Sequence, residues 1–155
     1  MKFFLILIAA ATTIISCGSN EVNSAENSVS AIKTVTDEEK SASLEDEANL
    51  TEIEWKDSTF QNLGKIKEGQ IVEIAWNFKN VGTKPLIIAN TSASCGCTVA
   101  EKPEAPIAVG KDGVIKAKFD SNGRQGSQRK DVYVVANTSG GKEHHLSFML
   151  EVEKK

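Results

Sequence analysis

The chain has 155 residues, of which 40% are hydrophobic and 25% charged, a composition that suits one globular domain with an additional segment. The formal net charge is −3, aromatic residues make up 6%, and the basic residues are dispersed, which argues against nucleic-acid binding. The charge is also uneven, because residues 18–54 hold ten acidic residues and two lysines, whereas residues 55–155 hold fifteen basic and eleven acidic residues.

Residues 1–16 predict a secretory signal peptide. Lys2 supplies a positive charge, and an apolar run follows as far as Ile15. This run is shorter than the roughly 20 residues that a helix needs to cross a membrane, so the pattern favours a cleaved signal over a permanent span.

Cys17 directly follows this run, in the sequence Ile14-Ile15-Ser16-Cys17. The position resembles the lipobox of bacterial lipoproteins, whose cysteine is acylated and becomes the new N-terminus. The letters depart from that pattern, because isoleucine stands where leucine and a small residue are usual. The resemblance implies a bacterial cell-envelope lipoprotein with a membrane anchor of fatty acyl groups, palmitate among them, on Cys17. The alternative is ordinary cleavage that leaves Cys17 as a free thiol.

Residues 17–54 predict the lipidated cysteine followed by a flexible acidic tether. Gly18 rather than aspartate follows the cysteine, which favours the outer membrane. The stretch has no aromatic residue and no sustained apolar period, so ordering it would cost about 1–2 kcal/mol per residue with little burial in return. We therefore expect residues 18–54 to be dispensable for folding.

From residue 55 onward, apolar and polar residues alternate, which predicts half-buried β-strands. In residues 70–79, one face holds Val72, Ile74, Trp76 and Phe78. Further strands are expected at residues 86–89, 113–120, 131–137 and 146–152, separated by segments rich in turn residues. About seven short strands without a helical stripe predict an all-β fold, an antiparallel β-sandwich over residues 55–155.

Several spaced motifs in this region resemble those of one bacterial family. The motifs are Phe60–Gly69, Phe78–Gly82, Pro85-Leu86, Ser94–Thr98, Pro106-Ile107 and Phe119–Arg124. The family is catalogued as domain of unknown function 1573, a small immunoglobulin-like domain common on envelope lipoproteins. The resemblance runs from about residue 60 to residue 152 and implies the sandwich fold and an envelope setting, but no activity.

The sharpest chemical feature is Cys95-Gly96-Cys97. On an extended strand, residues two apart lie about 6.6 Å from each other, at the upper edge of disulfide geometry, and a turn at Gly96 would bring them closer. Three interpretations compete: a local disulfide that stiffens a loop, a thiol-redox pair, and a soft-metal site. The last is weakened because two thiolates are only half of a tetrahedral ligand set.

The remaining candidate residues have plain structural interpretations. His144 and His145 are neighbours on a predicted strand and face opposite sides, with His144 on the buried row, so they do not form a metal site together. Arg124 lies in a glycine-flanked turn between strands and is interpreted as an exposed hairpin tip rather than a phosphate site. Trp55 and Trp76 are interpreted as core residues.

The sequence shows no signature of an enzyme, such as a phosphate-binding glycine loop, a nucleophile elbow or a recognisable carboxylate pair. We predict a non-catalytic protein without a cofactor, a lipid-anchored interaction or structural module that binds an envelope protein through loops or edge strands. The alternative is an envelope thiol-redox or soft-metal-binding protein that uses Cys95 and Cys97. The redox state of these two cysteines in protein taken from cells distinguishes the two.

Overall fold

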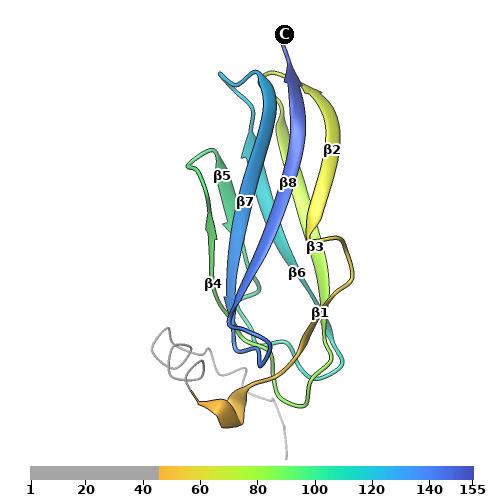
Figure 1. The fold of residues 1–155 in the computed structure, drawn as a ribbon, viewed down its shortest axis with the longest axis vertical. Helices are drawn as coiled ribbons and strands as arrows, with labels where there is room; N and C mark the ends of the chain where they lie inside the picture. Colours follow the sequence, from red (N-terminus) through yellow and green to blue (C-terminus); the bar gives the residue numbers. More distant parts are fainter. Residues whose placement is uncertain (1–45) are drawn as a thin grey trace, which may run out of the picture. The chain divides into compact units, whose positions relative to one another are not determined.

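The structure, a computed structural model, describes residues 46–155, which form two four-stranded β-sheets (Figure 1). The predicted signal peptide, Cys17 and the tether as far as residue 45 lie outside the described residues. The strand orders are β1-β3-β6-β5 and β2-β8-β7-β4. The elements are η1 (Glu47–Asn49), β1 (Ile53–Trp55), β2 (Phe60–Lys67), β3 (Ile71–Asn80), β4 (Ile88–Ala93), β5 (Thr98–Glu101), β6 (Asp112–Asp120), β7 (Gly126–Ala136) and β8 (Glu143–Glu153). No helix in this part of the chain is long and apolar enough to cross a membrane.

The alternating residues of the strands build one core between the two sheets. In β3, Ile74, Trp76 and Phe78 are buried, as the sequence pattern predicts. The rings of Phe119 on β6 and Phe148 on β8 meet edge to face with centroids 5.8 Å apart, so they join the two sheets across the core. The predicted all-β sandwich is therefore confirmed, with eight strands in the described residues instead of about seven.

One pairing departs from the predicted antiparallel arrangement. β2 runs parallel to β8, while the other paired strands of both sheets run antiparallel. The cause is a change of sheet between residues 55 and 60, because β1 belongs to one sheet and β2 to the other. Alternation of side chains shows which face of a strand is buried, but it contains no information on the direction of the neighbouring strand.

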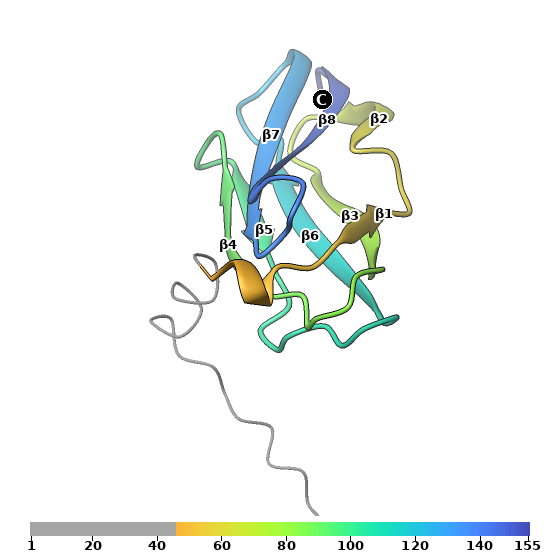
Figure 2. The ribbon, with the colours of Figure 1, turned by 60° about the horizontal axis from the view of Figure 1, so that its bottom comes forward.

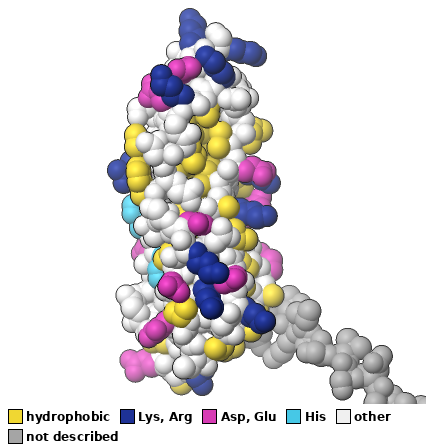
Figure 3. Space-filling view, turned by 90° about the vertical axis from the view of Figure 1, so that its right-hand side faces the viewer, with side chains coloured by type: hydrophobic (Ala, Val, Ile, Leu, Met, Phe, Trp, Pro, Cys, Tyr) yellow, Lys and Arg dark blue, Asp and Glu magenta, His cyan; other side chains and the backbone are white. Residues whose placement is uncertain are grey.

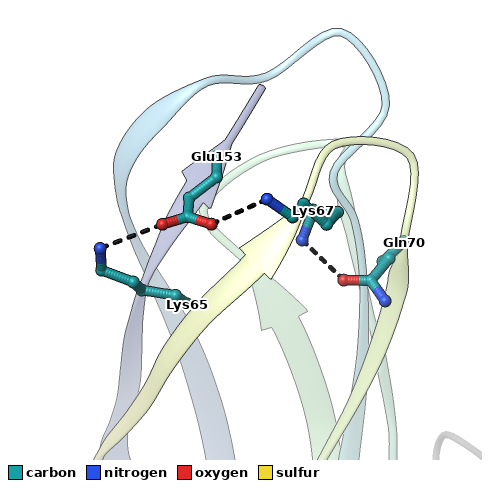
Figure 4. Close-up of polar contacts among 4 residues, drawn as sticks. All are labelled: Lys65, Lys67, Gln70 and Glu153. Carbon is teal, nitrogen blue, oxygen red and sulfur yellow. Dashed lines mark hydrogen bonds and ion pairs between the residues drawn. The ribbon is translucent and has the colours of Figure 1, made fainter. Parts of the chain in front are cut away.

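Charged side chains fasten β2 to the end of β8 (Figure 4). The Glu153 carboxylate accepts hydrogen bonds from the ammonium groups of Lys65 and Lys67, each at 3.0 Å. The bond from Lys65, followed by that from Lys67, holds the pKa of Glu153 below its usual value. The backbone N–H of Lys67 also donates to Gln70 Oε1 at 2.7 Å, which helps to close the turn into β3. Since exposed ion pairs contribute little stability, we assign these contacts to the register of β2 rather than to the strength of the fold.

Ordered packing begins inside the segment that the sequence predicts to be a dispensable tether, before the predicted domain boundary at residue 55. Asp46 caps η1, because its carboxylate accepts from the backbone N–H of Ala48 at 2.9 Å. Thr51 is buried, and its backbone N–H donates to the carbonyl of Asn137 at 2.9 Å, while its own carbonyl accepts from the N–H of Ser139 at 3.0 Å. This segment binds through backbone groups and one hydroxyl, so it lacks the apolar pattern by which a strand is found in a sequence.

Asn80, at the end of β3, is fully buried and uses its whole amide group (Figure 2 brings this end of the sandwich forward). Its Oδ1 accepts from Thr51 Oγ1 at 3.0 Å and from the N–H of Gly82 at 3.2 Å. Its Nδ2 donates to the carbonyls of Lys84 at 2.8 Å and Ile107 at 2.9 Å. One side chain therefore joins the incoming chain to the loops that follow β3 and β5.

Asn137, directly after β7, does the same for the neighbouring segments. Its Oδ1 accepts from the N–H of Ile87 at 2.7 Å. Its Nδ2 donates to the carbonyls of Asn49 at 2.7 Å and Pro85 at 3.0 Å. The two asparagines thus satisfy buried backbone groups that have no strand ladder to pair with.

We predict that Asn80→Ala lowers the free energy of unfolding by about 2–4 kcal/mol, because it removes four hydrogen bonds of a buried amide, including the one that the N–H of Gly82 donates. Urea denaturation of the variant and the native protein measures the difference, provided that the slope of the transition is unchanged. Asn62→Ala is the matched control. The exposed Asn62 side chain accepts one bond from Gly64 at 3.0 Å, so its loss should cost no more than about 0.5 kcal/mol. Equal losses in the two variants would contradict a structural role for Asn80.

Candidate functional site

Cys95 and Cys97 lie at the corner where the chain leaves β4 in one sheet and begins β5 in the other. The backbone N–H of Thr98 donates to the carbonyl of Cys95 at 3.2 Å, which closes a four-residue turn. The N–H of Asp120 on β6 donates to the carbonyl of Cys97 at 3.0 Å and ties the turn to the neighbouring strand.

A disulfide joins the two cysteines, with sulfur atoms 1.94 Å and Cα atoms 5.3 Å apart. Cys97 is 9% exposed and belongs to the core, whereas Cys95 is only partly buried against it. Thr98 Oγ1 lies 3.6 Å from Cys95 Sγ and 3.9 Å from Cys97 Sγ. The turn therefore combines a partly exposed cysteine, a buried cysteine and a hydroxyl that lies 3.6 Å and 3.9 Å from their sulfur atoms. The oxidation state of the pair in cells stays a prediction.

The two histidines have the parity expected from the sequence. His144 is partly buried, where its Nε2 lies 2.8 Å from Thr138 Oγ1 and its ring meets that of Trp55 edge to face at 5.9 Å. His145 is exposed, lies 2.9 Å from Asp131 Oδ1 and stacks on a tyrosine ring. Each histidine has its own partners on its own side of β8, and the two rings do not share a site.

Metal ligands do not gather in the domain. Within residues 46–155, no three side chains of His, Cys, Asp or Glu are placed to hold a metal ion. Cys95 and Cys97 therefore have no third ligand in the described part of the chain, and the soft-metal interpretation gains no structural support there.

Arg124 bends back on its own turn instead of extending from a hairpin tip. Its Nη1 donates to the carbonyl of Asn122 at 2.8 Å, and its backbone N–H donates to the carbonyl of Ser121 at 3.1 Å. The side chain is only partly exposed, which differs from the exposed arginine expected from the sequence. The guanidinium completes the turn, so it satisfies a carbonyl that the glycine-rich loop would otherwise leave to water.

An open strand edge was not visible in the sequence. β3 pairs with β6 over residues 71–79, but with β1 only over residues 78–80. Most of β3 therefore has a neighbouring strand on one side only. Ile71, the first residue of this edge, is 68% exposed. A strand pattern alone cannot show that the adjacent strand is too short to cover it.

These features define a small immunoglobulin-like β-sandwich with a cysteine pair in the turn between two edge strands. The family model described as "Protein of unknown function (DUF1573)" matches residues 53–152, and the chain belongs to this family. The family resemblance of the sequence motifs is thereby confirmed. No curated protein matches the chain.

Two solved structures illustrate the likeness. A protein of unknown function from Porphyromonas gingivalis W83 is 20% identical, with a TM-score of 0.58 over 67% of this chain and 48% of that one. The VesB protease of Vibrio cholerae is 15% identical, with a TM-score of 0.52 over 67% of this chain and 32% of that one. The chain thus spans about half of the first protein and about a third of the second. At these identities the likeness shows the fold alone.

His144 makes the stability of the domain dependent on pH. Burial lowers its pKa from 6.5, so the unfolded chain takes up the proton more readily than the folded one. The contribution of His144 is therefore complete above pH 6.5 and is lost as the pH falls through its lower, folded pKa. The carboxyl groups Asp112 and Glu153, whose pKa values are lowered by lysine partners, act in a more acidic window.

We predict that the free energy of unfolding of the native protein falls between pH 7 and pH 5.5, and that His144→Gln flattens this decline. The glutamine amide would keep a polar group near Thr138 without titrating. Urea denaturation at a series of pH values measures the slope, and both proteins should run parallel above pH 7. A slope that is the same in both proteins below pH 6.5 would show that His144 is not the group responsible.

Proposed function

We propose that this protein is a lipid-anchored, non-catalytic interaction module of the bacterial cell envelope. In this proposal, acyl groups on Cys17 hold the chain at a membrane, with the outer membrane favoured, and the acidic residues that follow serve as a spacer. The sandwich then binds a protein partner. Membership of a family whose description states no activity supports this proposal.

The open edge of β3 is the observation that carries the proposal. Two side chains take the place of a neighbouring strand along residues 75–77 of β3. Gln61 Nε2 donates to the carbonyl of Ala75 at 2.8 Å, and Asp57 Oδ2 accepts from the N–H of Asn77 at 2.7 Å. Alternate residues of a strand direct their backbone groups to the same side. The backbone N–H and C=O groups of residues 71 and 73 that point away from β6 therefore have no strand to pair with. Such an edge readily accepts an added strand.

The position and surface of this edge favour a protein partner. The exposed Ile71 side chain offers an apolar anchor, and Figure 3, which faces the side of β2 and β3, shows apolar surface between scattered charges. The edge begins at the end of the sandwich where β8 also finishes, because the N–H of Glu68 donates to the carbonyl of Glu153 at 2.9 Å. The chain enters at η1, at the opposite end (Figure 1). The described chain therefore begins at the end of the sandwich that is opposite to the first residues of this edge.

A photo-crosslinking residue in place of Ile71, in intact cells, tests the anchor and the edge together. The anchored protein should crosslink to an envelope protein, and Cys17→Ala should leave the membrane fraction. Its crosslinking yield should then fall by about tenfold, because the anchor no longer concentrates the two proteins at one surface. Immunoblots of fractionated cells measure both outcomes.

The matched control carries the same crosslinking residue in place of Val109, which is 51% exposed and lies outside the strands. It should give no comparable product. Glu73→Pro in the Ile71 crosslinking background removes a backbone donor of the open edge, and we expect it to abolish the product without lowering the melting temperature. A processed Cys17→Ala protein that stays in the membrane fraction would overturn the anchor, and equal products from positions 71 and 109 would overturn the edge.

A further inference from the structure

We propose that the Cys95–Cys97 disulfide is a thiol-exchange site that oxidises a pair of cysteine thiols in another protein, one pair for each disulfide, so that it is a stoichiometric reactant within a non-catalytic module. The inference concerns a different part of the sandwich from the open edge of β3, and it stands or fails separately from the interaction proposed there. The turn raises the question of what a disulfide between residues two apart contributes at this corner.

Stabilisation of the fold is a weak answer. A disulfide stabilises a protein mainly by closing a loop in the unfolded chain, and the effect shrinks with the length of that loop. Here the sequence separation is 2, so the closed loop is minimal. The corner is also held without the sulfur atoms, since the N–H of Ser94 donates to the carbonyl of Asp131 at 2.9 Å and the N–H of Asp131 donates to Ser94 Oγ at 3.1 Å. Opening the disulfide therefore leaves the corner hydrogen-bonded to β7 through Ser94. It also leaves the corner bonded to β6, through the N–H of Asp120 and the carbonyl of Cys97.

The two sulfur atoms are placed unequally, as an exchange reaction requires. Cys95 is partly exposed, whereas Cys97 lies in the core at 9% exposure. An incoming thiolate meets Cys95 first, so Cys97 is the leaving group. This order gives the reaction a direction that can be tested one cysteine at a time.

One polar group, the hydroxyl of Thr98, lies close enough to both sulfur atoms to stabilise a thiolate. Thr98 Oγ1 lies 3.9 Å from Cys97 Sγ and 3.6 Å from Cys95 Sγ, where its hydrogen can turn toward whichever sulfur becomes charged. A hydroxyl that donates a hydrogen bond to a thiolate stabilises the charged sulfur.

The exchange proceeds in two displacements. A substrate thiolate attacks Cys95 Sγ, the bond between Cys95 and Cys97 breaks, and its electron pair leaves on Cys97 Sγ, which then takes a proton. The second substrate thiolate attacks the substrate sulfur of the mixed disulfide and releases Cys95 as a thiolate, which is protonated in turn. The substrate dithiol has become a disulfide, and the protein disulfide has become a dithiol, so two electrons and two protons have moved to the cysteine pair.

The surface beside the turn suits a peptide substrate. Val99, two residues after Cys97, is 60% exposed on the outer face of β5. An extended chain segment that covers Val99 would have its own cysteines close to Cys95. We therefore assign the substrate to cysteine pairs that are flanked by apolar residues, in a protein segment that is still accessible.

The test uses the full, oxidised chain in detergent and a reduced synthetic peptide with two cysteines and flanking valines, mixed at equal concentrations at pH 7. Quenching with an alkylating reagent and mass spectrometry follows the appearance of two alkylated cysteines in the protein and of the peptide disulfide. We expect both to appear at the same rate. Thr98→Val should slow the reaction by about tenfold through loss of the hydrogen bond to the leaving thiolate, and Thr98→Ser should restore it. Thr91→Val, on β4, is the matched control and should react like the native protein.

Single cysteine variants test the direction. Against the oxidised form of the same peptide, Cys97→Ser should trap a mixed disulfide through Cys95, and Cys95→Ser should trap it at least about tenfold more slowly, because Cys97 is buried. The native disulfide unfolded in urea should be reduced by the peptide, which shows that the probe is competent. A folded native protein that stays oxidised while the unfolded one reacts would overturn the proposal. Equal trapping by the two single variants would overturn it as well.

Discussion

Two buried asparagine side chains, Asn80 and Asn137, hold together the end of the sandwich where the chain enters. Exposed to 0% and 1%, they bind the segment before β1 and the loops that follow β3 and β5. Loops that meet inside a protein bring backbone donors and acceptors that no strand ladder satisfies. An asparagine amide offers two donors and an acceptor on a short side chain, so each of these asparagines can hydrogen-bond several of the unpaired backbone groups at once. The loop after β3 also lies very close to the segment before β1, because a Cβ on Gly82 would collide with Thr51 Oγ1.

This constraint determines where the rest of the molecule is free. With the loops and the incoming chain fixed at one end, the β4–β5 corner and the first half of β3 need only ordinary strand contacts. Both are places where pairing is incomplete: β5 has four residues, and β1 covers β3 over three residue pairs only. A rigid scaffold that leaves edges and turns exposed is the arrangement in which binding and exchange sites usually occur. The proposed docking edge and the proposed thiol site both follow from it.

Much of the sandwich could be predicted from the sequence because its strands are amphipathic. The alternation of Ile74, Trp76 and Phe78 identified the buried face of β3, and the same parity separated His144 from His145. The spacing of Cys95 and Cys97 indicated a turn and allowed a local disulfide as one of three interpretations, and the structure joins the two sulfur atoms. In each case the information is local, since period-two alternation and short spacings are written in neighbouring residues.

The parts that could not be predicted depend on residues far apart in the chain. The parallel pairing of β2 with β8 and the short cover of β3 by β1 are properties of strand order, which alternation does not encode. Thr51 and Asn80 are polar, and polar residues normally indicate surface, yet their mutual hydrogen bond is buried. Arg124 was expected to be exposed, but the carbonyl of Asn122 accepts from it within the turn. Such roles depend on which groups the fold brings together.

The central claim is that the segment before β1 belongs to the cooperative fold through the asparagine network. Hydrogen exchange at the backbone amide of Thr51, which donates to the carbonyl of Asn137 at 2.9 Å, tests it most directly. We predict that this amide exchanges only on global unfolding, as slowly as the N–H of Asn80, which donates to the carbonyl of Lys111 at 3.0 Å. The N–H of Asn49, in the exposed turn of η1, should exchange much faster. A Thr51 amide that exchanges as fast as that of Asn49 would contradict the account.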